Sequence, residues 1–375
     1  MALKAAARVW LEIDLGVLQA NFRRIARAVA PCQVIGVLKA NAYGLGALPI
    51  ARALHQVGCQ RFGVAELNEG FGLADIGADV QLLGAVLPDE IEQAVLAGIV
   101  LPVGDLATAR QISEAAVRLG RRARAHFLVD TGMGRVGVWW EEAEEELLAI
   151  PPGVRIHSLS THLPSSDDDE VFTARQLSDF ERLAESLRPL APGAKIHELN
   201  SAGIMRFPHH AADIVRAGLI LYGSSPLPEV ARLCCPALTW KTRVSLVRDL
   251  PAGTGVGYGR TFLTLHPMRT AVLAAGYADG YPRQVSGRGA AVLVGGKKCA
   301  VLGRVTMDQI VVDVTSVHDA QPGDEAVLIG RQGTEQITAE ELASQADTIP
   351  WHIFTGIKSR VARVYGDDRQ QKPGL

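Results

Sequence analysis

The sequence predicts an α/β fold joined to an all-β one: a (β/α)8 barrel followed by a mostly antiparallel β-domain. The chain has 375 residues, enough for two or three domains of ordinary size. Up to about residue 222, short apolar runs alternate with amphipathic stretches, whereas after about residue 237 strand-like runs follow one another with little helix between them. We therefore place the barrel at residues 1–235 and the β-domain at residues 236–375. An alternative assignment joins the first few residues to the β-domain.

The apolar runs of the first domain are nearly continuous and are separated by helical patterns, which is typical of a parallel sheet buried on both faces. The expected strands are 34–39, 62–65, 80–85, 99–103, 125–130, 155–161, 196–199 and 213–218. The expected helices are 105–119, 168–187 and an earlier one with Leu15, Leu18, Phe22, Ile25 and Val29 at helical spacing. Eight strands fit a barrel, and a doubly wound open sheet is the alternative because strand number does not determine closure.

The second domain contains strand-like runs punctuated by turn residues. The expected strands are 238–247, 269–276, 290–294, 299–303, 309–314 and 325–330. Gly295-Gly296 stands between two of these runs and predicts a tight hairpin. Thr338 and Glu341 form a capping-box pattern that predicts the start of one short helix. These patterns favour an antiparallel domain.

The charge balance and the cysteines exclude several classes of protein. The chain has 38 Lys and Arg against 40 Asp and Glu, so it lacks the basic field of a typical nucleic-acid binder. Its five cysteines include no CxxC pair, and neither a disulfide framework nor a metal site is expected. No apolar run approaches roughly 18 residues, and the first residues do not resemble a signal peptide. We expect a cytoplasmic protein without a membrane or nucleic-acid partner.

Polar residues follow the predicted strands at their carboxyl ends, where the functional residues of barrels lie. They are Lys39, Asp130–Arg135, Thr161-His162, Asn200–Gly203 and Arg216–Gly218. This set offers an amine, two guanidiniums, an imidazole and turns with backbone N–H groups, which suits a phosphate-bearing ring that binds a lysine as a Schiff base. A desolvated lysine after an apolar run loses basicity and becomes a competent nucleophile toward an aldehyde.

Several motifs stand in a characteristic order along nearly the whole chain. They are KANAYG at 39–44, DTGMGRVG at 130–137, Thr161-His162, Asn200-Ser201, Arg216, VGYG at 256–259, GYADGY at 276–281 and GRVTMDQ at 303–309. Together they resemble the alanine racemases, barrel-type enzymes that use pyridoxal 5′-phosphate (PLP). The resemblance implies a homodimer with shared active sites that interconverts L-alanine and D-alanine and supplies D-alanine for peptidoglycan.

The resemblance also implies a role for individual residues. Lys39 is expected to bind PLP covalently and to act as one catalytic base, and Tyr258 of the partner subunit as the other. Two bases on opposite faces of the cofactor remove and return an α-proton most simply. His162, linked to Arg216, is expected to adjust the pKa of Tyr258, and Arg216 is expected to donate to the ring nitrogen of the cofactor.

The other implied site residues bind cofactor or substrate. The cofactor is expected to contact Tyr43, Arg135, His162, Asn200, Ser201, Arg216, Gly218, Leu219 and Trp351. The substrate is expected to contact Arg135, together with Tyr277 and Met307 of the partner subunit.

Four positions depart from the family pattern. Leu128 replaces a lysine that is carbamylated in many members, Trp351 replaces a tyrosine, Leu45 replaces a histidine, and residues 165–170 read SSDDDE. Because these changes concern specificity more than reaction type, a racemase of broader specificity, for serine, lysine or other side chains, is an alternative. A non-catalytic PLP carrier and a barrel-type decarboxylase are further alternatives, although a carrier lacks the β-domain and no catalytic-cysteine motif of a decarboxylase stands near the C-terminus.

Overall fold

The computed structural model describes residues 7–366, which form two compact units. One unit, the barrel unit, holds residues 18–42 and 46–235. The other, the β unit, takes the chain up to Val17, the short stretch Tyr43–Leu45 and the chain from Pro236 onward.

The centre of the barrel unit is a sheet of eight parallel strands. They are β2 (Gln33–Val37), β3 (Arg61–Val64), β4 (Asp79–Leu82), β5 (Leu101–Val103), β6 (Ala123–Asp130), β8 (Val154–Ser160), β9 (Lys195–His197) and β10 (Ile214–Ala217). Neighbours follow the order β4-β3-β2-β10-β9-β8-β6-β5, and a parallel bridge between Gln81 and Val100 joins the two ends. The sheet is therefore closed, which confirms the predicted barrel and its eight strands and excludes the doubly wound alternative.

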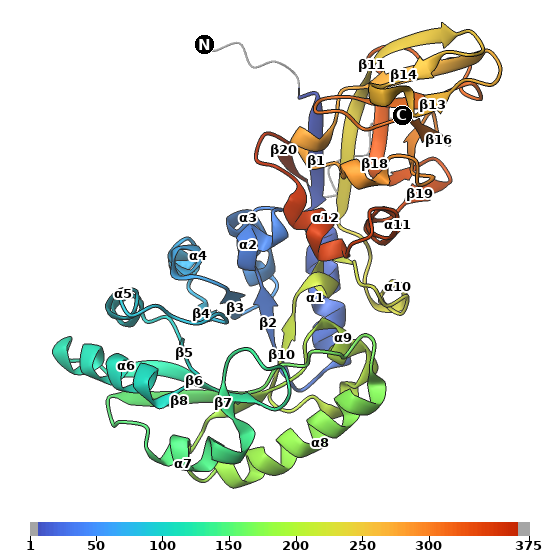
Figure 1. Cartoon of the computed structure of the whole chain (residues 1–375). Helices are drawn as coiled ribbons and strands as arrows, with labels where there is room; N and C mark the ends of the chain where they lie inside the picture. Colours follow the sequence, from blue (N-terminus) through green and yellow to red (C-terminus); the bar gives the residue numbers. More distant parts are fainter. Residues whose placement is uncertain (1–6, 367–375) are drawn as a thin grey trace, which may run out of the picture. The chain divides into compact units, whose positions relative to one another are not determined.

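Helices lie along the outside of the barrel strands, as α6 and α8 show in Figure 1. The helices are α1 (Leu15–Ala28), α3 (Ala47–Gln56), α4 (Leu67–Phe71), α5 (Ile91–Ala97), α6 (Leu106–Arg118), α7 (Ala143–Leu148), α8 (Glu170–Leu187), α9 (Ser201–Arg206) and α10 (Val230–Leu233). The predicted apolar stripe of α1 is buried at Leu18, Phe22 and Ile25. Asp105 caps α6 by accepting the Thr108 N–H at 2.7 Å.

The β unit is built on a nine-stranded sheet of order β19-β18-β15-β16-β17-β14-β11-β1-β20. Its strands are β1 (Val9–Asp14), β11 (Leu238–Leu250), β14 (Met268–Leu273), β15 (Ala291–Val294), β16 (Lys297–Leu302), β17 (Ile310–Asp313), β18 (Glu325–Gln332), β19 (Glu335–Ile337) and β20 (Ala362–Gly366). Strand β1 pairs antiparallel with β11 and parallel with β20. Gly295 and Gly296, with φ of 56° and 75°, join β15 to β16, so the predicted hairpin is confirmed.

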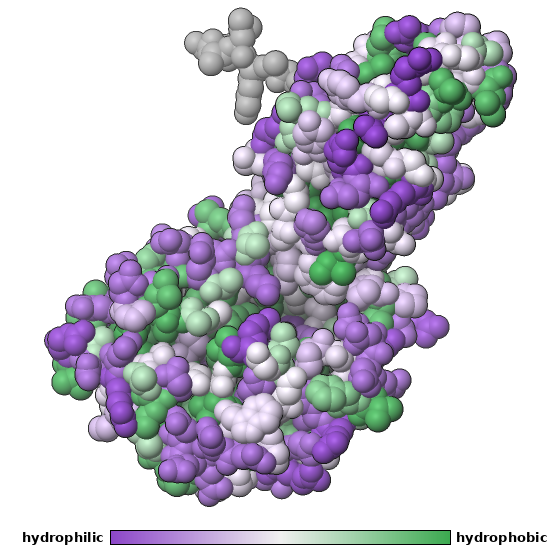
Figure 2. Space-filling model, viewed as in Figure 1, coloured by the Kyte–Doolittle hydropathy of each residue, from purple (hydrophilic) through white to green (hydrophobic). Residues whose placement is uncertain are grey.

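Smaller elements complete the described chain. They are α2 (Lys39–Tyr43), β7 (Val138–Trp139), β12 (Gly255–Val256), β13 (Phe262–Leu263), α11 (Ala339–Gln345) and α12 (Pro350–Gly356). Thr338 accepts the Glu341 N–H at 3.1 Å and so caps α11 as predicted. Figure 2 shows hydrophilic and hydrophobic side chains interspersed over the visible face of the barrel unit. Among the helices of residues 7–366, none is long and apolar enough to cross a membrane.

Candidate active site

The segment that follows β2 folds into a left-handed turn, α2. Ala40, Asn41 and Ala42 have φ values of 52°, 54° and 54°, and Tyr43 has a φ of 55°. Residues with a Cβ atom avoid this conformation because the Cβ approaches a carbonyl oxygen, at a cost of roughly 1–2 kcal/mol per residue. Four such residues in succession need support from outside the turn. The turn sets the direction in which the chain leaves Lys39.

The surroundings of Lys39 favour its neutral amine. The side chain is exposed in the single chain, yet its pKa is lowered, first by partial desolvation and then by the positive charge of Arg135, with a smaller effect of Arg216. The negative charge of Glu69 acts in the opposite direction. A lysine with a lowered pKa is more often unprotonated at neutral pH, as attack on an aldehyde requires.

Arg216, near the end of β10, fixes one cation inside the rim of the barrel. Its Nη1 donates to Nδ1 and to the carbonyl oxygen of His197, at 2.7 and 3.0 Å. Its Nη2 donates to the carbonyl oxygens of Thr161 and Glu198, at 2.8 and 3.0 Å, and to Nδ1 of His162 at 3.2 Å. Burial lowers the pKa of Arg216 to about 10, so the guanidinium stays charged at neutral pH.

His162 is held as a neutral imidazole. Desolvation, and after it the charge of Arg216, lowers the pKa of His162 to about 3. Because the guanidinium can only donate, Nδ1 of His162 accepts and its proton lies on Nε2. The structure therefore brings together the predicted pair His162 and Arg216, which lie 54 positions apart in the sequence.

Ser201 and the turn after β10 form a cluster of hydrogen-bond donors. The Ser201 Oγ accepts the Gly218 N–H at 3.0 Å and the Ile220 N–H at 3.5 Å, which leaves its own hydroxyl proton to donate. Leu219, which stands between these two residues in the sequence, is buried. Asn200 caps α9 by accepting the Gly203 N–H at 3.0 Å, so its side chain positions the helix that starts with Ser201.

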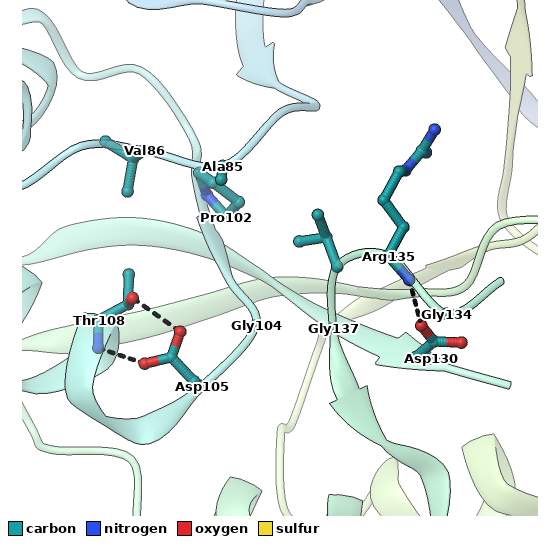
Figure 3. A pocket seen from close by; sticks show the side chains of 11 residues that line it. Ala85, Val86, Pro102, Gly104, Asp105, Thr108, Asp130, Gly134, Arg135 and Gly137 are labelled. Atoms are coloured by element: carbon teal, nitrogen blue, oxygen red, sulfur yellow. Dashed lines mark hydrogen bonds between the residues drawn. The ribbon is translucent and has the colours of Figure 1, made fainter. Parts of the chain in front are cut away.

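The Asp130 loop presents Arg135. The Asp130 carboxylate accepts the N–H groups of Gly132, Met133 and Arg135, at 2.9, 2.8 and 3.0 Å, and the Arg135 side chain extends away from it (Figure 3). Among residues 7–366 the guanidinium of Arg135 makes no hydrogen bond or ion pair. A cavity of about 450 Å³ lies beside this loop and is lined by Asp130, Gly134 and Arg135, but by none of the other residues assigned to cofactor or substrate.

The predicted partner-side residues belong to the β unit and are exposed in the single chain. The exposed fractions are 73% for Tyr258, 39% for Tyr277 and 54% for Met307. Gly257 and Gly259, with φ of 68° and 73°, flank Tyr258 in a tight turn. All three side chains belong to the β unit, whereas Lys39 belongs to the barrel unit.

Two loops of the β unit are locked together where Tyr277 and Met307 stand. Tyr277 N–H donates to the Thr306 carbonyl at 3.0 Å, and Ala278 N–H donates to the Met307 carbonyl at 2.9 Å. A Cβ atom at Gly276 would lie 2.3 Å from the Thr306 oxygen, so only glycine fits there.

Arg360 adds an ionic bridge between the same loops. Its guanidinium contacts the buried carboxylate of Asp279 and that of Asp308, each at 3.0 Å. Tyr43, which is buried, and Trp351, in α12, also belong to the β unit.

Three candidate functional residues were not predicted from the sequence. His197 supports Arg216, Glu69 lies beside the lysine turn, and Arg360 joins the two loops of the β unit. His197 could have been found from strand alternation, because it belongs to a predicted barrel strand and carries a polar side chain inward. Glu69 and Arg360 carry no motif or periodicity that distinguishes them from surface charges.

Two family models cover nearly the whole chain. Residues 13–226 match the model described as "Alanine racemase, N-terminal domain", and residues 237–365 match "Alanine racemase, C-terminal domain". The chain belongs to the alanine racemase family. It is therefore an enzyme of this family, and the family resemblance found in the sequence is confirmed.

Similar proteins extend over the same length. The alanine racemase of Symbiobacterium thermophilum is 42% identical, with 98% of this chain and 100% of the relative covered, and that of Halothermothrix orenii is 40% identical, with 95% and 96% covered. The solved structure of the alanine racemase of D-cycloserine-producing Streptomyces lavendulae matches with a TM-score of 0.90 at 35% identity and covers 99% of both chains. That of Bartonella henselae, with covalently bound pyridoxal phosphate, matches with a TM-score of 0.87 at 31% identity and covers 96% of this chain and 100% of the other.

Proposed function

We propose that the enzyme interconverts L-alanine and D-alanine with PLP and two bases, Lys39 and Tyr258 of a partner subunit. The observation that carries this proposal is the lysine turn: an amine of lowered pKa stands at the rim of a barrel beside the cations Arg135 and Arg216. The PLP prediction is confirmed through the family and through the B. henselae relative, which contains pyridoxal phosphate bound covalently.

The donors at the rim fit the groups of PLP. The Ser201 hydroxyl, whose own proton is left to donate, suits a phosphate. The N–H groups of Gly218 and Ile220 donate to its oxygen, and Asn200 caps the helix that starts with Ser201. Arg216 suits the ring nitrogen, and the unpaired guanidinium of Arg135 suits the phenolic oxygen and the carboxylate of the substrate. We assign Gly218, Leu219, Tyr43 and Trp351 to the phosphate by resemblance.

Bound PLP supplies an electron-withdrawing ring that acidifies the α-proton of an attached amino acid. Lys39 would hold the cofactor, and its Nζ would take or return the proton on one face. Tyr258 does the same at its phenolic oxygen on the other face. Its free pKa near 10 is too high for this task, and His162 with Arg216 provides the environment that adjusts it.

Arg216 limits the chemistry to racemisation. A guanidinium keeps its protons and donates one hydrogen bond to the ring nitrogen without transferring the proton. The five hydrogen bonds that Arg216 makes to barrel groups fix this donor in place. Side reactions such as transamination and decarboxylation are thereby disfavoured.

The shared site requires a homodimer. The exposure of Tyr258, Tyr277 and Met307 in the single chain supports this arrangement, because aromatic and thioether side chains are more often buried. The five free cysteines fit the reducing cytoplasm, where D-alanine would serve as a precursor of peptidoglycan.

The absorption spectrum of the purified protein tests the cofactor assignment. We expect a yellow protein with the visible band of lysine-bound PLP, and Lys39→Ala abolishes the band, whereas the control Lys195→Ala, an exposed lysine of the same unit, keeps it. A wild-type protein that stays colourless after PLP addition contradicts the proposal. Mixing Lys39→Ala with Tyr258→Phe subunits restores part of the racemisation through hybrid dimers, and no recovery despite proven subunit exchange contradicts a shared site.

A racemase of broader specificity is the second candidate, and Leu128 favours it because Arg135 has no side-chain partner within residues 7–366. A panel of L-amino acids followed by chiral chromatography separates the two. Alanine turnover well above all others supports the first candidate, and comparable turnover of serine or lysine supports the second.

A further inference from the structure

Glu69, in α4, ties the lysine turn to the neighbouring barrel strand. Its Oε1 accepts the Asn41 N–H at 3.0 Å, and its Oε2 accepts the Ala65 N–H at 2.9 Å. Asn41 lies in the left-handed turn after β2, and Ala65 directly follows β3. One carboxylate therefore joins the carboxyl ends of two adjacent strands.

Asn41 passes this constraint on to the rest of the segment. Its carbonyl oxygen accepts the Gly46 N–H at 2.9 Å, and its Oδ1 accepts the Ala47 N–H at 2.8 Å, at the first residue of α3. On the other side of the turn, the Ala42 N–H donates to the Leu38 carbonyl at 2.7 Å. The Glu69 bond adds an anchor to α4, the helix that follows the neighbouring strand β3.

Glu69 also contributes charge. Among the groups that shift the pKa of Lys39, the cations Arg135 and Arg216 lower it and Glu69 alone raises it. The carboxylate thus acts on the lysine in two ways, through the backbone of the turn and through its charge. Hydrogen bonds from N–H groups to a charged acceptor are stronger than those to a neutral one.

We propose that Glu69 is a positioning residue that holds Lys39 in the orientation required for covalent binding of PLP. The proposal rests on the proposed function of Lys39. It assigns a role to a side chain that acts through the backbone N–H groups of Asn41 and Ala65.

The test compares Glu69→Gln with the control Glu66→Gln in the full-length protein with PLP. Glu66 lies on the same helix end, is exposed and makes no capping hydrogen bond. Glu69→Gln keeps one acceptor but turns an NH2 group toward the other N–H, and we expect the PLP dissociation constant to rise about tenfold. We also expect the visible circular dichroism of the lysine-bound cofactor to change, because the orientation of Lys39 changes. The control leaves both unchanged.

Two further variants separate positioning from general destabilisation. Glu69→Asp keeps the charge but is one methylene shorter, so it reaches one N–H and is expected to lose less PLP affinity; it also serves if Glu69→Gln does not fold. Ala40→Gly removes the Cβ atom that disfavours the left-handed conformation. In the Glu69→Gln background it is expected to restore part of the lost PLP affinity. Wild-type affinity and dichroism in Glu69→Gln, or no rescue by Ala40→Gly, overturn the proposal. A wild-type protein without the PLP band overturns the proposed function instead.

Discussion

The buried carboxyl group of Glu198 provides a sharp test of the electrostatics of the barrel. Glu198 is 1% exposed, and neither of its carboxylate oxygens has a hydrogen-bond partner among the described residues. Desolvation, followed by the charge of Glu181, raises the pKa of Glu198 to about 8, although Arg216 acts in the opposite direction. The folded protein therefore keeps this carboxyl protonated at pH 7, whereas the unfolded chain ionises it near its ordinary pKa.

The consequence is a loss of stability as the pH rises. A group whose pKa is higher in the folded than in the unfolded chain stabilises the folded state. This stabilisation is fully present below the pKa of the unfolded chain, and it is lost as the pH rises to the pKa of the folded state. One proton corresponds to about 1.4 kcal/mol per pH unit, so between pH 5 and pH 7 the loss is about 3 kcal/mol. Glu198→Gln removes the titrating group while retaining a neutral side chain of similar shape.

Urea unfolding of wild type and Glu198→Gln at pH 5, 6 and 7 measures this effect. The difference in unfolding free energy between the two proteins should shift in favour of the variant by about 1.4 kcal/mol per pH unit. Because all other groups are common to both proteins, their contributions cancel in the difference. A difference that is independent of pH refutes the reasoning.

Three further predictions concern the site. Ser201→Ala removes the hydroxyl on which two N–H groups converge, and the PLP dissociation constant measured by absorbance should rise about tenfold; an unchanged constant contradicts the assigned phosphate site. Arg360→Ala releases two loops of the β unit and should raise the KM for alanine more than it lowers kcat, and Arg360→Lys should restore part of the effect. Arg288→Ala, which removes an ion pair 4.0 Å long, is the control. An equal effect of Arg288→Ala contradicts the role of Arg360 in holding the loops. His162, with its pKa lowered to about 3, should show no NMR titration between pH 5 and pH 8, and a midpoint near 6.5 would refute the neutral assignment.

The strands and helices of the barrel could be predicted because burial on two faces imposes apolar runs, and burial on one face imposes a helical period. The hairpin at Gly295-Gly296 and the cap at Thr338 depend on local geometry, so they could also be predicted from the sequence. The closure of the barrel could not be predicted from the number of strands, because it depends on the bridge between Gln81 and Val100, which leaves no pattern in the sequence.

The site was predictable only in part. Lys39 follows the buried strand β2, and Arg216 stands next to the last residue of the buried strand β10, which marks both as rim residues. The left-handed conformation of Ala40 and Ala42 was not predictable, since alanine strongly favours the right-handed helix and only tertiary bonds overrule that preference. Glu69 acts through backbone N–H groups of distant segments, and such a bond leaves no pattern in the sequence.

The central claim is that Lys39 and Tyr258 act on opposite faces of the substrate. The most direct test follows the α-proton of L-alanine and of D-alanine in D2O by proton NMR, with wild type and Tyr258→Phe. Wild type should exchange the α-proton of both enantiomers. The variant should keep the PLP band, lose most racemisation and exchange the α-proton of one enantiomer only, because one base remains. Normal exchange of both enantiomers by the variant would contradict the two-base assignment.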